Sequence, residues 1–210
     1  MTIPTAESRE TSAPPLPGLL ARLSTTRFNA NAGLVCDVGI SLVLIAAGIY
    51  TNHFGILAPL ATVAAGMLVF SLIEYCFHRW LFHVGRSSMR EGHDKHHVDP
   101  HGYDALPFFF PPIGMLLLAG LLAFFLPTST ALLLAGATAA GYAAYGVAHT
   151  IIHAIRFRHR AAVKWASNHH IHHHHPDCNF GVTTPLWDIV LGTRYVPART
   201  RVPATASDER

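Results

Sequence analysis

The chain has 210 residues, of which half are apolar and 13% are charged, and its formal net charge is +3. This length suits one domain, and so few charges beside long apolar runs indicate a membrane protein rather than a soluble one. The basic residues flank the apolar runs instead of forming one stripe, which argues against nucleic acid as a partner.

The two ends of the chain are predicted to be disordered tails. Residues 1–27 are rich in Pro, Ser, Thr and charge, and they lack the basic patch followed by an apolar core of a cleaved signal peptide. Residues 198–210 form the second tail. Residues 28–197 between them are expected to form one membrane domain.

Four apolar segments follow the first tail, at residues 34–50, 54–77, 113–126 and 129–152. A membrane-spanning helix needs about 20 apolar residues, so the second and fourth segments are long enough, whereas the first and third are marginal and could be short or partly re-entrant. The fourth is dense in Ala and Gly, which lets neighbouring helices approach closely. Short links predict an all-α membrane protein with about four transmembrane helices in two hairpins and a histidine-rich helical cap.

The positions of Lys and Arg predict how these helices are oriented. Basic residues precede the first segment, separate the second from the third and follow the fourth, and both short links lack them. Because cytoplasmic loops carry an excess of Lys and Arg, both termini and the cap are expected in the cytoplasm, in a bacterial case at the inner or plasma membrane.

Histidine is the unusual residue of this sequence. Its sixteen copies outnumber the fifteen Lys and Arg residues, and ten of them form two membrane-end pairs and two His-x-x-His-His motifs. These ten are His78, His83, His93, His96, His97, His149, His153, His169, His172 and His173. Spacings of three and four place side chains on one helix face, and all four groups are predicted on the same side of the membrane. His170, His173 and His174 have the same spacing as the last motif, so spacing alone leaves its register open.

A site made of imidazoles suits Fe, Zn, Cu or Ni. A closed structural zinc site needs four ligands, so ten candidates favour two metal ions. Spacing does not separate iron-based oxidation from zinc-based hydrolysis. The place of the histidines, at the mouth of a helix bundle that opens towards lipid, favours insertion of oxygen into a C–H bond of a lipid chain.

The histidines also lie in longer motifs. These are Glu74-Tyr-x-x-His78-Arg-x-Leu-Phe-His83, Gly92-His93-x-x-His96-His97, Gly141-Tyr-x-x-Tyr145-x-x-x-His149-x-x-x-His153 and Asn179-Phe-Gly-Val-Thr-Thr-Pro-Leu-Trp-Asp-Ile-Val-Leu-Gly-Thr193. Together they resemble the fatty acid hydroxylase/sterol desaturase superfamily over residues 74–195. The resemblance implies an O2-dependent membrane enzyme with two metal ions, expected to be iron with zinc as an alternative in the isolated protein. It also implies an external ferredoxin- or cytochrome-type electron donor.

The resemblance assigns the ten histidines as metal ligands and favours the 169/172/173 register, because the family places its last His-His pair shortly before Phe-Gly-Val. Four other residues are candidates for supporting the ligands. Glu74 lies one helical turn before His78 and could hydrogen-bond an imidazole. Tyr145 lies one turn before His149, and His170 and His174 are the remaining two.

The sequence therefore predicts an oxidoreductase that hydroxylates the acyl chain of a membrane lipid, with no catalytic residue beyond the metal ligands. Desaturation of a lipid or sterol, or hydroxylation of a carotenoid, is the alternative on the same scaffold, because hydroxylation and desaturation can start from the same hydrogen abstraction. A metal-dependent membrane hydrolase is the alternative from another class. A metal carrier is disfavoured because the histidines lie at the ends of the apolar segments.

Overall fold

The computed structural model describes residues 18–84, 88–103 and 105–197. All regular secondary structure in these ranges is helical, as predicted. The helices are α1 (Leu19–Ser24), α2 (Arg27–Tyr50), α3 (Leu57–Cys76), the π-helix η1 (Phe77–Phe82), α4 (Ser88–Val98), α5 (Phe110–Ala123), α6 (Thr128–Ala154), α7 (Arg160–His174) and α8 (Leu186–Val190). Residues 1–17 and 198–210 of the predicted tails lie outside the described residues. Helix α1, by contrast, falls in a part of the first tail for which disorder was expected.

Within the described ranges, three helical stretches are long and apolar enough to cross a membrane, namely α2, α3 continued by η1, and α6. Helix α5 is equally apolar but has only 14 residues, fewer than the roughly 20 that a span needs. The first apolar segment was expected to be marginal, whereas α2 begins at Arg27. The Thr26 side chain accepts a hydrogen bond from the Asn29 backbone N–H at 3.1 Å and caps this earlier start.

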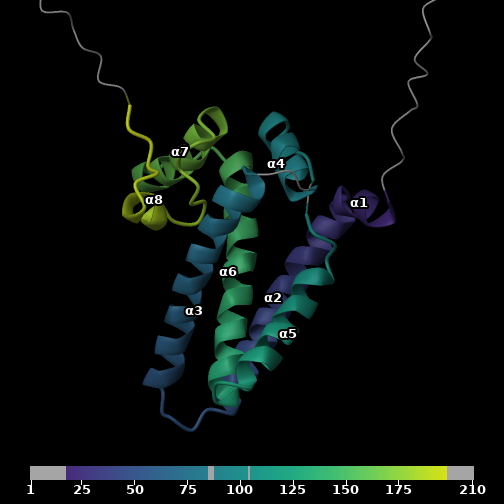
Figure 1. Cartoon of the computed structure of the whole chain (residues 1–210), viewed down its shortest axis with the longest axis vertical. Coiled ribbons are helices and arrows are strands. Elements are labelled where there is room, and N and C mark those ends of the chain that lie inside the picture. The colour runs from purple at the N-terminus through teal and green to yellow at the C-terminus, as the bar shows by residue number, and fades with distance from the viewer. Residues whose placement is uncertain (1–17, 85–87, 104, 198–210) are drawn as a thin grey trace, which may run out of the picture.

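Helix α6 is the centre of the bundle. It packs against α2, α3 and α5, with α3 on one side and α2 and α5 on the other (Figure 1). The two links make hairpin connections as predicted, but α2 and α3 of the first hairpin are separated by α6. Small residues permit this packing, since a Cβ at Gly136 would lie only 2.9 Å from the backbone N of Ile45.

Helices α4, α7 and α8 form a cap at the end of the bundle where α3 gives way to η1 and α6 ends (Figure 1). The links between α2 and α3 and between α5 and α6 lie at the opposite end. All four histidine groups therefore meet at one end of the molecule.

Candidate metal centre

Ten histidines gather in two groups of five under the cap. The first group consists of His78, His83, His93, His97 and His172, and the second of His96, His149, His153, His169 and His173. Within each group, one potential ligand nitrogen of every residue lies within 4.8 Å of the others. These are the same ten residues that the sequence patterns selected, so the structure brings all of them together.

Each His-x-x-His-His motif is divided between the two groups. Helix α4 contributes His93 and His97 to the first group and His96 to the second, whereas α7 contributes His169 and His173 to the second group and His172 to the first. Residues four apart share a helix face, while adjacent residues point about 100° apart. A motif of this kind therefore holds the two groups side by side, which spacing alone did not predict.

The π-helix η1 explains how His78 and His83 reach the same group. Residues five apart on an α-helix are turned about 140° from each other. A π-helix closes its hydrogen bonds between residues five apart and so brings such side chains towards one side. The local winding at Phe77–Phe82 thus places both imidazoles in the first group.

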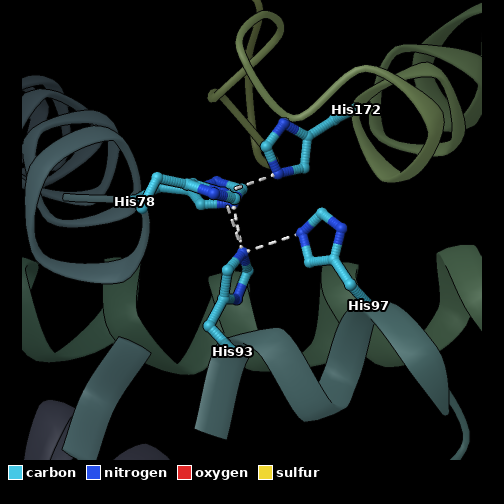
Figure 2. A group of neighbouring side chains, drawn as sticks. His78, His93, His97 and His172 are labelled. Carbon is cyan, nitrogen blue, oxygen red and sulfur yellow. Dashed lines mark hydrogen bonds between the residues drawn. The ribbon is translucent and has the colours of Figure 1, made fainter. Parts of the chain in front are cut away.

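The ring nitrogens of the first group converge (Figure 2). The Nε2 atom of His93 lies 3.1 Å from that of His78 and 3.0 Å from those of His83 and His97, and the Nε2 atoms of His83 and His172 are 3.0 Å apart. In the second group, the Nε2 atom of His169 lies 3.0 Å from that of His153 and 3.1 Å from that of His173. The rings of His97 and His173 stack across the two groups, with centroids 4.5 Å apart.

These distances test whether metal ions fit. Nitrogen ligands lie about 2.0–2.1 Å from a zinc ion, so two nitrogens about 3 Å apart subtend an angle of roughly 90° at a shared ion of that size. Tetrahedral ligands would be roughly 3.4 Å apart. The five nitrogens of the first group, which four spacings of 3.0–3.1 Å connect, fit an ion of high coordination number better than closed tetrahedral zinc.

The imidazoles are prepared to act as ligands because burial keeps them neutral. Burial lowers the pKa of His96 to about 4 and that of His172 to about 3. It also lowers the pKa of His173 to about 2, so these rings keep a free lone pair at neutral pH. The Nε2 atoms of His96 and His149 are buried without a hydrogen-bond partner, as expected of nitrogens that bind metal. Both groups consist only of histidine, a donor set that suits Fe, Zn, Cu or Ni.

Backbone carbonyls of the loop between α7 and α8 orient two rings of the first group. The Nδ1 atom of His78 lies 2.5 Å from the carbonyl oxygen of Phe180, and that of His172 lies 2.8 Å from the carbonyl oxygen of Cys178. A partner at Nδ1 fixes the tautomer and directs Nε2 at the metal. In the second group, the Nδ1 atom of His169 is buried without such a partner. The two groups are therefore supported unequally.

Two buried carboxylates hold this loop from opposite sides. Asp188 accepts hydrogen bonds from the backbone N–H groups of Phe180 and Gly181 at 2.8 Å and from the Thr193 hydroxyl at 2.7 Å. The peptide group between Phe180 and Gly181 thus donates to Asp188 and accepts from His78. The sequence motif contains Asp188 but gives no sign of this link, which is visible only in the structure.

Glu74 also binds this loop, at Val182 and Thr183, and does not bind an imidazole. Its Oε1 atom accepts from the backbone N–H groups of Val182 at 2.7 Å and Thr183 at 2.9 Å, and its Oε2 atom accepts from the Thr183 hydroxyl. In the structure, the Glu74 oxygens thus accept from this loop and not from an imidazole. The ring of His78 turns its Nδ1 atom to Phe180, and Glu74 supports it through the loop.

The three other supporting candidates have different surroundings. The ring of Tyr145 stacks on His149, with centroids 5.7 Å apart and planes 9° apart. His170 is exposed and its ring centroid lies 5.7 Å from that of His153. His174 is exposed and belongs to neither group. The structure thus assembles the 169/172/173 register and leaves His170 and His174 on the outer face of α7.

The chain is similar to known proteins in sequence and in fold. The chain is 32% identical over 143 residues to a dihydroceramide fatty acyl 2-hydroxylase of Arabidopsis thaliana, covering 62% of this chain and 59% of the relative. It is 27% identical over 163 residues to a fatty acid 2-hydroxylase of Rattus norvegicus, covering 69% of this chain and 43% of the relative. The match therefore spans less than two thirds of either relative. The hydroxylase domain visible in full-length Scs7p has a similar fold, with a TM-score of 0.73, 24% identity and coverage of 90% of this chain and 74% of that chain.

A family model described as fatty acid hydroxylase matches residues 63–193. This range is more than half of the chain and includes every histidine of the two groups. The chain belongs to the fatty acid hydroxylase family.

Proposed function

We propose that the protein hydroxylates the acyl chain of a membrane lipid in an O2-dependent reaction, with two metal ions, expected to be iron, held by the two histidine groups. The observation that carries this proposal is the pair of adjacent groups of five neutral imidazoles at one end of an apolar helix bundle. The names of the relatives, which are fatty acyl hydroxylases, support the same reaction.

The balance of the reaction defines what the protein must receive. Conversion of R–H, O2, two electrons and two protons into R–OH and water needs a reductant, and neither histidine group contains a redox-active side chain. An external electron donor of the ferredoxin or cytochrome type is the proposed source. The bound ions would supply the activation of O2, a chemistry that side chains alone do not provide.

The chain's own residues would orient the imidazoles of the first group and cover part of it. Phe82 stacks on His93 with ring centroids 5.1 Å apart, and Phe180 packs against the rings of His78, His83 and His172 at 5.6–6.0 Å. These aromatic rings cover part of the first group and would hold its imidazoles in place. The carbonyl of Phe180 holds the tautomer of His78.

The place of the site in the molecule favours a lipid substrate. Both groups lie where the membrane-length stretches α3 with η1 and α6 end, so an acyl chain could reach them without leaving the bilayer. The distribution of Lys and Arg supports a cytoplasmic cap with both termini on that side, accessible to a soluble electron donor.

The test is to measure products and metal together. Lipid extracts from cells with and without the gene would be compared by mass, and the purified protein would be assayed with isotopically labelled O2 and an electron donor. We expect iron in the protein and a lipid heavier by one oxygen that carries the label. A lipid lighter by two hydrogens would show a desaturase instead. Product formation without O2 would refute the oxidative function and point to a hydrolase.

A further inference from the structure

A second feature next to the histidines is a cavity of about 300 Å³ at the end of η1, lined by both polar and apolar residues. Its wall includes Arg79, Trp80, His83, Asp177 and Phe180. Because His83 belongs to the first histidine group, a molecule in this cavity would lie directly beside the candidate metal centre. The mechanism described above does not use Arg79, Trp80 or Asp177.

Arg79 is held rigidly at this cavity. Its Nη1 atom donates to the hydroxyl oxygen of Tyr75 at 2.9 Å, and its guanidinium carbon lies 5.5–5.9 Å from the ring centroids of Trp80, Phe180 and Tyr75. Such contacts favour the cation and hold its plane in place. Among residues 18–84, 88–103 and 105–197, no carboxylate forms an ion pair with Arg79. A guanidinium has five N–H donors, so several remain available to a ligand.

The cavity lies at one end of a membrane-length helical stretch, a place that fits the polar head of a lipid. The membrane-length stretch Leu57–Phe82 ends here, and Trp80 is 50% exposed, as is typical of an indole at the boundary between lipid and water. A lipid with its head in this cavity would extend its chain along the apolar surface of α3. Its first carbons would then be the part nearest to His83.

We infer that this cavity binds the polar head of the acyl lipid, with Arg79 donating hydrogen bonds to an oxygen of the acyl group. This inference rests on the proposed function for the identity of the ligand. Asp177, which is exposed in the same wall, sets the choice between two sources of that oxygen. An amide-linked acyl group offers a carbonyl to Arg79 and an N–H to Asp177, whereas a free carboxylate is attracted by Arg79 and repelled by Asp177.

The test is equilibrium binding of two radiolabelled probes, palmitic acid and N-palmitoylethanolamine, to the full-length, metal-loaded protein in detergent, without electron donor. Charge-assisted hydrogen bonds contribute about 1.5–3 kcal/mol. We therefore expect Arg79→Gln to weaken binding of both probes about tenfold to a hundredfold. Asp177→Asn should weaken binding of the amide and strengthen that of the free acid. The exposed position of Asp177 makes this second variant safe for folding.

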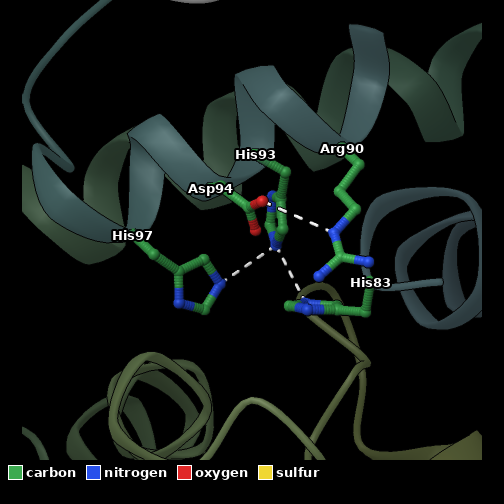
Figure 3. A network of polar contacts seen from close by, with 5 residues as sticks. All are labelled: His83, Arg90, His93, Asp94 and His97. Carbon is green, nitrogen blue, oxygen red and sulfur yellow. Dashed lines mark hydrogen bonds and ion pairs between the residues drawn. The ribbon is translucent and has the colours of Figure 1, made fainter. Parts of the chain in front are cut away.

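Two further variants separate a ligand-binding role of Arg79 from a structural one. Arg90→Gln removes a cation that pairs with Asp94 at 3.4 Å near His83 but outside the cavity wall (Figure 3), and it should bind both probes like the parent protein. Tyr75→Phe removes the hydroxyl that Arg79 contacts but keeps the guanidinium. If Arg79→Gln binds both probes like the parent, or if Tyr75→Phe weakens them equally, the inference is wrong.

Failure of this inference and failure of the proposed function give different results. Binding is measured without turnover. A protein that needs Arg79 to bind acyl lipids but oxidises none of them would support this inference and refute the proposed function. A protein that hydroxylates lipid with an unchanged KM after Arg79→Gln would support the proposed function and refute this inference.

Discussion

Asp188→Asn is the substitution that tests the support of the first histidine group most directly. Both oxygens of Asp188 face backbone N–H groups, those of Phe180 and Gly181, which cannot rotate to become acceptors. Asparagine keeps one oxygen and turns an NH2 group towards the other N–H. The change removes one charge-assisted hydrogen bond and leaves a buried donor unsatisfied, which together we expect to cost about 3 kcal/mol of stability.

The same substitution should weaken metal binding. One peptide group joins Asp188 to His78, since its N–H donates to the carboxylate and its carbonyl accepts from the imidazole. Loss of a hydrogen-bond partner that orients a metal ligand typically lowers metal affinity about 10–100-fold. Titration with a competing chelator, followed by elemental analysis, measures this change, and thermal unfolding in detergent measures the stability.

Glu74→Gln is the matched control. Its Oε1 atom can keep both N–H groups of Val182 and Thr183, and its new NH2 group faces the Thr183 hydroxyl, which can rotate to accept. We expect a loss of about 1 kcal/mol or less. If both variants lose stability and metal equally, the orientation of the donors does not determine the effect and the reasoning fails.

Three further predictions follow from the geometry. His173→Ala should lower the metal content of the purified protein, measured by elemental analysis, whereas His174→Ala next to it should leave the content unchanged; the reverse would refute the register. Gly136→Ala should destabilise the bundle by about 1–3 kcal/mol in thermal unfolding, because its Cβ would meet the backbone of the facing helix. Gly146→Ala, with open space around the new Cβ, should instead stabilise by about 0.5–1 kcal/mol; equal effects would exclude close packing as the cause. Stepwise chelation should remove one ion first, because within the described residues two rings of the first group are held by backbone carbonyls, whereas the Nδ1 atom of His169 in the second group has no partner; loss of both ions in a single step would contradict this.

The spacing of the histidines predicted which residues gather in the candidate site. Regular spacings selected ten of sixteen histidines, and the same ten form the two groups. The pattern succeeds because helical spacing converts sequence distance directly into direction. The pattern did not show that each motif is divided between two groups, because spacing alone does not reveal a second group of ligands towards which His96 could point.

The winding of η1 and the carboxylate contacts could not be read from the sequence. Nothing in the composition of Phe77–Phe82 distinguishes a π-helix from an α-helix. Glu74 and Asp188 find their partners in a loop more than a hundred residues from Glu74. A carboxylate near a helix end predicts that a partner exists, but only the fold identifies it.

The outline of the bundle was predicted better than its packing. Hydropathy located the apolar segments but placed the start of α2 too late, because Arg27 and Asn29 interrupt the apolar run without ending the helix. Short links were taken to pair neighbouring helices, whereas small residues on α6 make it the common partner of α2, α3 and α5. Connection length limits how far apart two helix ends lie, and side-chain size determines which helices touch.

The absence of carboxylates from the two groups has an electrostatic consequence. Ten neutral imidazoles would leave the charge of two bound divalent ions uncompensated by their ligands, and buried charge is costly without a counter-charge. Glu74 and Asp188 are 6% and 1% exposed and both bind the loop that contacts His78. Asp188 places negative charge next to His78 through the peptide group between Phe180 and Gly181, and Glu74 binds the neighbouring N–H groups of Val182 and Thr183, so neither occupies a ligand position. Under the proposed function, this negative charge would offset part of the charge of the ions while histidine remains the only ligand type in both groups.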